Sequence, residues 1–261
     1  MKKLLIASFV VVGLMCGAFL ARAKANPTKT PVLVELFTSE GCSSCPPVDA
    51  WLNDIDRTQP LPDAQLIVLS EHVDYWNHDG WKDPYSSHLL TERQSDYERS
   101  LRVSEPFTPQ VVVDGTGQPH FNSPQQVEQV FKSAVASAKI PIAITALTIN
   151  SSGIHMHLNV NGENASHGAE VFVAIALSHA ESQVSRGENS GRHLVHTAVV
   201  ESLQKVGSLK KGNSFDKDVE LKLKTPVDPA NLRIVAFAQE PGPGRVLGAA
   251  LQTPQAPNVG H

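Results

Sequence analysis

Cysteine and clustered positive charge are both scarce in this sequence of 261 residues. It contains three cysteines, and because Cys16 lies inside an apolar N-terminal run, Cys42 and Cys45 form the only pair elsewhere in the chain. Structural disulfides of exported proteins usually occur in sets and close longer loops, so a disulfide-rich scaffold is excluded. The absence of a Lys/Arg cluster argues against nucleic acid or anionic lipid as a partner.

The N-terminus has the features of a cleaved signal peptide. Two lysines precede an apolar run from Leu4 to about Leu20, and two overlapping A-x-A cleavage sites end at Ala23 and Ala25. We therefore expect residues 1–25 to be removed and the protein to be periplasmic or secreted, with no stable membrane span after cleavage. An uncleaved anchor is the alternative, because a run of roughly 17 apolar residues is near the lower limit for a span.

The chain that remains is acidic and keeps one cysteine pair. Cleavage after Ala25 removes four basic residues and no acids, which leaves 18 basic and 26 acidic residues and a net charge of −8. A C-x-x-C loop is so short that closing it removes little entropy from the unfolded chain. The compartment and the spacing together favour redox chemistry at Cys42 and Cys45 over a structural staple.

The first half of the chain alternates between strand and helix patterns. Buried strands are expected at 32–37, 66–69 and 111–113, the last turning at Asp114-Gly115 into a hairpin partner. Amphipathic helices are expected after the cysteines, over 87–103, and from Ser123-Pro124 onward. The predicted order is β-α-β-α-β-β-α.

From about Pro141 the chain alternates around short turns and predicts strands only. Residues 141–253 resemble a β-sandwich, with turns every 8–12 residues. The sequence thus predicts an α/β domain over 27–140, an all-β sandwich-like domain over 141–253, and a flexible tail over 254–261.

The C-x-x-C pair follows a buried strand and opens a helix. Backbone N–H groups and the positive end of the helix dipole stabilise a thiolate at such a position, so we expect the pKa of Cys42 to be lowered. Cys42 would then attack a disulfide, and Cys45 would resolve the mixed disulfide. Because proline fits the first turn of a helix, this helix is expected to start at Pro46 or Pro47.

At these residues the first half resembles the thioredoxin superfamily, which carries strand–C-x-x-C–helix and, later, a cis-proline facing the dithiol. Thr108-Pro109, ahead of three valines, matches that second element, and the resemblance implies a cis bond that shapes the substrate groove. It also implies that Glu35 is a buried proton acceptor, although Glu35 lies seven residues before Cys42, one more than is usual. The alternative for Glu35 is a strand-edge residue that faces water.

More narrowly, the chain resembles DUF1223, a family of exported bacterial proteins of uncharacterised function. The matching stretches are VELFTSEGCSSCPP, HVDYWNHDGWKDP, RQSDY, FTPQVVVDG and GENSGRHLVHTAVV. The resemblance implies a thioredoxin-like domain joined to a β-rich one and supplies no reaction. One departure is Phe107, where tyrosine is expected before Thr-Pro.

A long polar and aromatic loop follows the second strand, whose end should lie at the same sheet edge as the dithiol. We expect it to contact substrate, with His72 or Asp74 near the sulfurs and with Tyr75 and Trp76 providing apolar contacts. The alternatives are a solvated surface loop and a Cu(I) or zinc site formed by both cysteines and a loop histidine. No second cysteine pair or His-x-x-x-His supports the metal site, and none is assigned.

Two further groups of polar residues have structural interpretations. The stretch 185–196 would be either a loop that reaches the first domain, with Glu188 paired to Arg192, or a hairpin loop held together by its own contacts, which we favour. His155 and His157 share one face of a strand and are interpreted as a solvated or packed face.

The sequence therefore predicts an exported thiol–disulfide oxidoreductase. Its catalytic residues would be Cys42, Cys45, Pro109 and Glu35, and Thr108 would join the loop residues at the substrate site. The dithiol carries the electrons, so no cofactor is needed, and the partners would be protein thiols or disulfides of the cell envelope. The alternatives are a metal-binding or metallochaperone module and a non-catalytic binding protein.

Overall fold

The computed structural model describes residues 29–150, 153–223 and 227–254. The predicted signal peptide and all of the predicted tail except Pro254 lie outside these residues. Within the described ranges, no helix combines the length and the apolar composition that crossing a bilayer requires.

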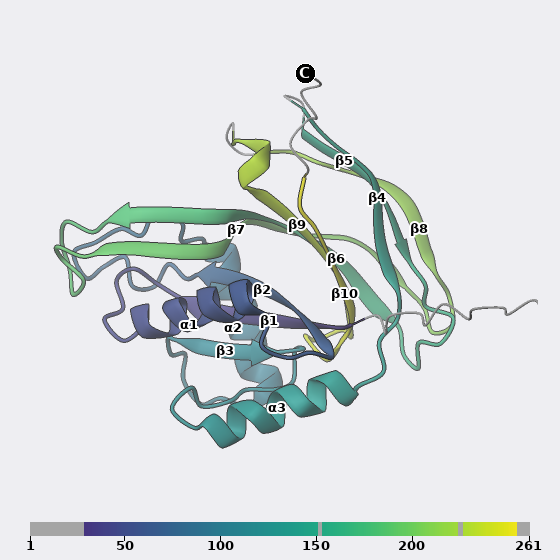
Figure 1. The fold of residues 1–261 in the computed structure, drawn as a ribbon, viewed down its shortest axis with the longest axis horizontal. Coiled ribbons are helices and arrows are strands. Elements are labelled where there is room, and N and C mark those ends of the chain that lie inside the picture. Colours follow the sequence, from purple (N-terminus) through teal and green to yellow (C-terminus); the bar gives the residue numbers. More distant parts are fainter. Residues whose placement is uncertain (1–28, 151–152, 224–226, 255–261) are drawn as a thin grey trace, which may run out of the picture.

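The described residues form a mixed α/β structure with two sheets (Figure 1). The larger sheet has seven strands in the order β10-β9-β6-β7-β2-β1-β3, and the smaller has three in the order β4-β5-β8. The strands of the larger sheet are β1 (Thr30–Thr38), β2 (Ala64–His72), β3 (Gln110–Val113), β6 (Ala169–Gln183), β7 (His193–Leu209), β9 (Leu232–Gln239) and β10 (Val246–Gln252). The remaining elements are β4 (Ile142–Asn150), β5 (Gly153–Val160), β8 (Phe215–Leu221), α1 (Pro46–Thr58), α2 (His88–Leu101), α3 (Pro124–Ala136) and the short 3-10 helix η1 (Pro229–Asn231).

Helices cover both faces of the sheet in the first half of the chain (Figure 1). Side chains alternate along β1, so Val34 and Leu36 pack against α1 and α3, whereas Leu33 packs on the other face with Leu90 of α2. This alternation decides which face of the sheet each polar residue of β1 occupies.

In the second half, the three-stranded sheet packs face to face against part of the larger sheet. Alternating apolar residues of β5 and β8, such as Leu158 and Val219, pack against Val173 of β6 and Ala236 of β9 in one core. The three-stranded sheet thus covers the β6-β9-β10 part of the larger sheet.

One sheet runs through both halves of the chain. β7 lies beside β2 in parallel, with Ser70 opposite Val199, and β6 pairs with β7 along almost its whole length. The predicted boundary at residue 140 therefore does not separate the two halves into independent sheets.

Two local predictions were wrong. The strand expected after Asp114-Gly115 is reduced to a single bridge between Val113 and Gly117, because α3 follows closely. β7 begins inside the stretch that was interpreted as a loop, and only the residues before His193 form the turn.

Candidate functional site

The two cysteines lie in the turn between β1 and α1. Cys45 is the N-cap of α1, and the helix starts at Pro46, as predicted. Cys42 and Cys45 are joined by a disulfide. The N–H of Cys42 donates to the carbonyl of Ser39 at 3.2 Å, which fixes the start of the turn.

The Thr108–Pro109 peptide bond lies beside this disulfide and is cis, as predicted. The carbonyl oxygen of Thr108 is 3.8 Å from Cys42 Sγ and accepts a hydrogen bond of 3.5 Å from the hydroxyl of Ser44. The indole N–H of Trp76 donates to the Thr108 hydroxyl at 2.8 Å. The loop after β2 thus reaches the dithiol through Trp76.

Both sulfur-bearing residues are fully buried. Cys42 and Cys45 have exposed fractions of 0%, whereas Ser43 and Ser44 between them are exposed. A substrate can therefore contact the two serines directly, but it can reach the buried sulfur atoms only after the residues packed around them move.

Part of the site comes from the loop between β6 and β7, residues 184–192. The buried side-chain amide of Asn189 donates to the carbonyls of Glu40 and Cys42 at 2.8 and 2.9 Å. The carboxylate of Glu188 accepts a hydrogen bond of 3.0 Å from the N–H of Ser43. The interpretation of this stretch as a loop held only by its own contacts was wrong, and Glu188 binds Ser43, not Arg192.

Glu35, the predicted proton acceptor, faces α2 and lies on the side of the sheet opposite α1 and its cysteine turn. Its carboxylate accepts hydrogen bonds of 2.6 Å each from Arg93 Nε and from the Tyr97 hydroxyl. Glu35 is therefore bound in an ion pair and is not placed to exchange a proton with Cys45. The extra residue between Glu35 and Cys42 explains why the predicted role of Glu35 was wrong. Successive side chains of a strand point to opposite faces of the sheet, so a shift of one residue moves the carboxylate to the other face. The alternative of a water-facing edge residue is also wrong, since Glu35 is fully buried.

A cluster of five buried ionisable residues lies behind the turn, on the α1 face of the sheet: Glu40, Asp49, His72, Asp83 and His196. His72 Nδ1 is 2.7 Å from an Asp83 oxygen, and the rings of His72 and His196 pack edge to face with centroids 4.7 Å apart. His196 Nε2 is 3.2 Å from a carboxylate oxygen of Glu40. We refer to these five residues as the buried acid–histidine cluster.

The charges within this cluster shift its pKa values in different directions. Burial alone would lower the pKa of His72, but the carboxylates of Asp83, Asp49 and Glu40 raise it above its usual value. Burial likewise opposes ionisation of Asp83, but His72 and two backbone N–H groups hold its pKa below the usual value. Burial raises the pKa of Asp49, which the two histidines only partly offset.

The sequence matches the family model described as "Protein of unknown function (DUF1223)" over residues 33–239. The chain belongs to the DUF1223 family. Its structure is similar to that of a structural genomics protein from Agrobacterium tumefaciens, with 25% identity, a TM-score of 0.69, and 90% of this chain and 99% of that chain covered.

A second similar structure is HBP35 of Porphyromonas gingivalis, with 14% identity and a TM-score of 0.62, covering 89% of this chain and 78% of that chain. At this identity the likeness concerns the fold alone. No curated protein matches the sequence.

The sequence stretches on which the DUF1223 resemblance was based converge in space. The first contains Cys42 and Cys45, the loop after β2 contributes Trp76, the stretch around β3 contributes Thr108, and the β6–β7 loop contributes Asn189. This convergence, and not any single motif, defines the candidate site of this DUF1223 protein.

The other predicted loop residues contact neighbouring parts of the protein, and only His72 is fully buried. His72 is fully buried in the acid–histidine cluster and cannot face a substrate. Asp74 accepts a hydrogen bond of 2.6 Å from the hydroxyl of Thr91 in α2. Tyr75 packs beside Trp76, and burial raises its pKa to about 12.

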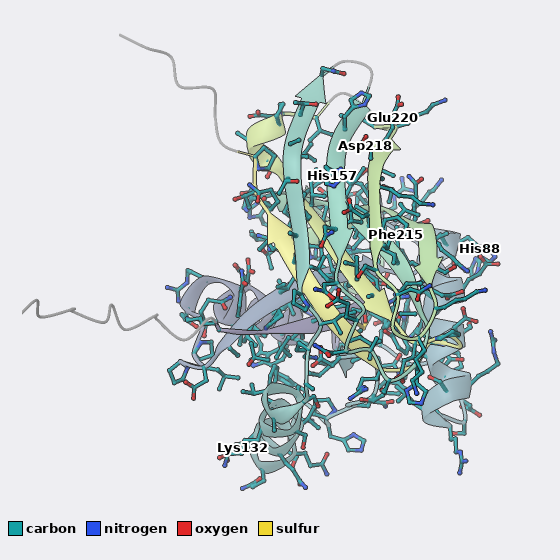
Figure 2. All side chains as sticks on the ribbon, turned by 90° about the vertical axis from the view of Figure 1, so that its right-hand side faces the viewer. His88, Lys132, His157, Phe215, Asp218 and Glu220 are labelled. Carbon is teal, nitrogen blue, oxygen red and sulfur yellow. A yellow bond between two sulfur atoms is a disulfide. The ribbon has the colours of Figure 1, made fainter. Side chains whose placement is uncertain are left out.

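The histidines of β5 were interpreted as a solvated or packed strand face. His157 lies on the outer face of the three-stranded sheet, with Nε2 2.6 Å from Asp216 and Nδ1 2.9 Å from Asp218 (Figure 2). In the part of the chain that the structure describes, no group of three or more His, Cys, Asp or Glu side chains is arranged to hold a metal ion.

Proposed function

We propose that this DUF1223 protein is an exported thiol–disulfide oxidoreductase whose reactive groups are Cys42 and Cys45. The observation that carries the proposal is their disulfide at the start of α1, beside the cis Thr108–Pro109 bond. A dithiol at a helix N-terminus is the arrangement in which one sulfur becomes an anion most readily.

The order of elements around the dithiol supports a thioredoxin-like fold for the first half. β1 and β2 are parallel and joined by α1, while β3 runs antiparallel to β1 immediately after the cis-proline. In this arrangement Pro109 and Thr108 would form one wall of the groove in which a substrate backbone would lie.

The reaction is an exchange of sulfur–sulfur bonds. The Cys42 thiolate attacks one sulfur of a substrate disulfide, a Cys42–substrate bond forms, and one substrate thiolate leaves. Cys45 then loses its proton and attacks Cys42 Sγ, which re-forms the Cys42–Cys45 disulfide and releases the second substrate thiolate. The protein loses two electrons, the substrate gains them, and the reverse sequence oxidises a substrate dithiol.

The dithiol supplies all the electrons, so the proposal needs no additional cofactor. The partners are thiols or disulfides of other proteins in the cell envelope, where the predicted signal peptide would deliver this chain.

The test is disulfide exchange with a protein substrate. We expect the full mature chain to catalyse insulin reduction with dithiothreitol, or to refold scrambled ribonuclease, and expect Cys42→Ser to abolish both activities. Cys45→Ser should accumulate a mixed disulfide through Cys42, which mass spectrometry would detect. Equal rates for wild type and Cys42→Ser would contradict the proposal.

A further inference from the structure

The β6–β7 loop is bonded to the cysteine turn through a fully buried residue, Asn189. Asn189 has an exposed fraction of 0%, and its amide bonds to Glu40 and Cys42 span the turn across Gly41. The loop itself is a closed unit, because the N–H of Gly191 donates to the carbonyl of Val184 at 2.8 Å. The contact thus joins two preformed turns that are almost 150 residues apart in the sequence.

Glu188 accepts a hydrogen bond from the N–H group of the residue that directly follows Cys42. The N–H groups of the turn stabilise a sulfur anion only while they are free to point at it. The N–H of Ser43 donates to the Glu188 carboxylate at 3.0 Å, and that of Cys45 donates to the carbonyl of Cys42 at 3.3 Å. Hydrogen bonds from Ser43 lower the pKa of Glu188, so its negative charge is present at neutral pH.

We infer that the 184–192 loop is a lid on the disulfide and that Glu188 lowers the reactivity of Cys42 while the lid is closed. Both cysteines are fully buried although the serines between them are exposed, and the loop bonds to both sides of the Cys42–Ser43 peptide, through Asn189 to the Cys42 carbonyl and through Glu188 to the Ser43 N–H. A substrate that displaces Glu188 frees the N–H of Ser43 for the thiolate and removes a neighbouring negative charge. The inference rests on the proposed function, because it describes how that dithiol is regulated.

The charge effect is tested with Glu188→Gln in a Cys45→Ser background, where the titrating thiol is Cys42. Glutamine keeps an oxygen that accepts the Ser43 bond, so the lid stays in place while the charge is lost. We expect a lower pKa for Cys42 by thiolate absorbance and alkylation by iodoacetamide about two- to fivefold faster at neutral pH. The matched control is Glu163→Gln, an exposed glutamate in another loop. An unchanged pKa in Glu188→Gln, or the same shift in the control, would overturn the role of Glu188.

The lid is tested with Asn189→Ala, which deletes both amide bonds to the turn. We expect the intact Cys42–Cys45 disulfide to be reduced by a phosphine about 30-fold faster than in wild type, since the two lost hydrogen bonds, at about 1 kcal/mol each, favour the open lid. Ser190→Ala is the control, because that side chain bonds only to the carbonyl of Ser185 within the loop. Equal reduction rates for the two folded variants would overturn the lid.

These outcomes are separable from the oxidoreductase proposal. Titration and phosphine reduction need no protein substrate, so they measure the lid even if insulin reduction fails. Conversely, an active enzyme whose Cys42 is insensitive to Glu188 and Asn189 keeps the proposed function and loses the lid.

Discussion

Arg93 Nε donates a 2.6 Å hydrogen bond to Glu35, and this ion pair is buried on the α2 face of the central sheet. The same guanidinium also lies 3.6 Å from Glu71 and 3.1 Å from the Tyr97 hydroxyl. One cation therefore compensates two buried carboxyl groups, and this arrangement leads to the first two predictions.

Arg93→Met should destabilise the protein by about 3–5 kcal/mol, because it leaves Glu35 and Glu71 buried without a cation. Urea unfolding followed by circular dichroism measures the change. Arg99→Met, at an exposed ion pair with Asp96 on the same helix, should cost less than about 1 kcal/mol. If the two variants lost similar amounts of unfolding free energy, the buried ion pair would contribute no more to stability than the exposed one.

Glu71→Gln should stabilise the protein more at neutral than at acidic pH. Burial and the neighbouring Glu35 raise the pKa of Glu71 well above 4.5, although Arg93 opposes this. Between the ordinary and the raised pKa the folded state binds more protons than the unfolded state, so stability falls as the pH rises.

Because glutamine carries no charge, this variant should lose that part of the pH dependence and be more stable than wild type near pH 7. The measurement is urea unfolding at a series of pH values, with the exposed Glu92→Gln as control. Parallel stability curves for wild type and Glu71→Gln would contradict this reasoning.

Asp49 is a better candidate than Glu35 for a proton acceptor near Cys45. It lies one helical turn after Cys45, and its N–H donates to the Cys45 carbonyl at 3.1 Å. Its Oδ1 is buried and has no hydrogen-bond partner among the residues that the structure describes. Asp49→Asn should slow disulfide closure after a mixed disulfide forms by about tenfold or more and change its pH profile.

Stopped-flow measurement of closure at several pH values checks this, with Glu35→Gln as the matched control. Both residues are buried carboxylic acids, but Glu35 lies on the opposite face of the sheet. An equal effect of the two substitutions would point to a loss of packing and not to proton transfer.

Trp76→Phe should reduce exchange with a protein substrate without changing the thiol chemistry. The indole N–H holds Thr108, and a lost hydrogen bond is worth about 1 kcal/mol, or roughly fivefold in kcat/KM. Trp51→Phe is the control. Trp51 lies on α1, and its ring packs against the rings of Phe121 and Phe131. If Trp76→Phe slowed the alkylation of Cys42 by a small molecule and left kcat/KM for the protein substrate unchanged, Trp76 would have no role in positioning the groove.

Local signals predicted the part of the site that is contiguous in the sequence. The apolar strand, the spacing of the cysteines and the prolines that follow them place α1 at Pro46, and Thr108-Pro109 ahead of three valines indicated the cis bond. Each of these features depends on backbone preferences within a few residues of the chain.

The contacts that complete the site join distant residues and leave no periodic pattern. The bond between Glu40 and His196 spans 156 positions, and that between Cys42 and Asn189 spans 147. The sequence analysis also placed Glu35 on the wrong face of the sheet. The seven-residue spacing from Glu35 to Cys42 could have shown this, because an acid six residues before Cys42 would lie at the position of Leu36, on the α1 face.

The pairing of β2 with β7 bears on how this chain can be divided. In a fragment that stopped at residue 140, β2 would become an exposed edge strand, because Ser70 would lose its partner Val199 in β7. The cysteine turn would also lose its hydrogen bonds to Asn189. Such a truncation product should self-associate, so biochemistry on this protein is best carried out with both segments on a single polypeptide.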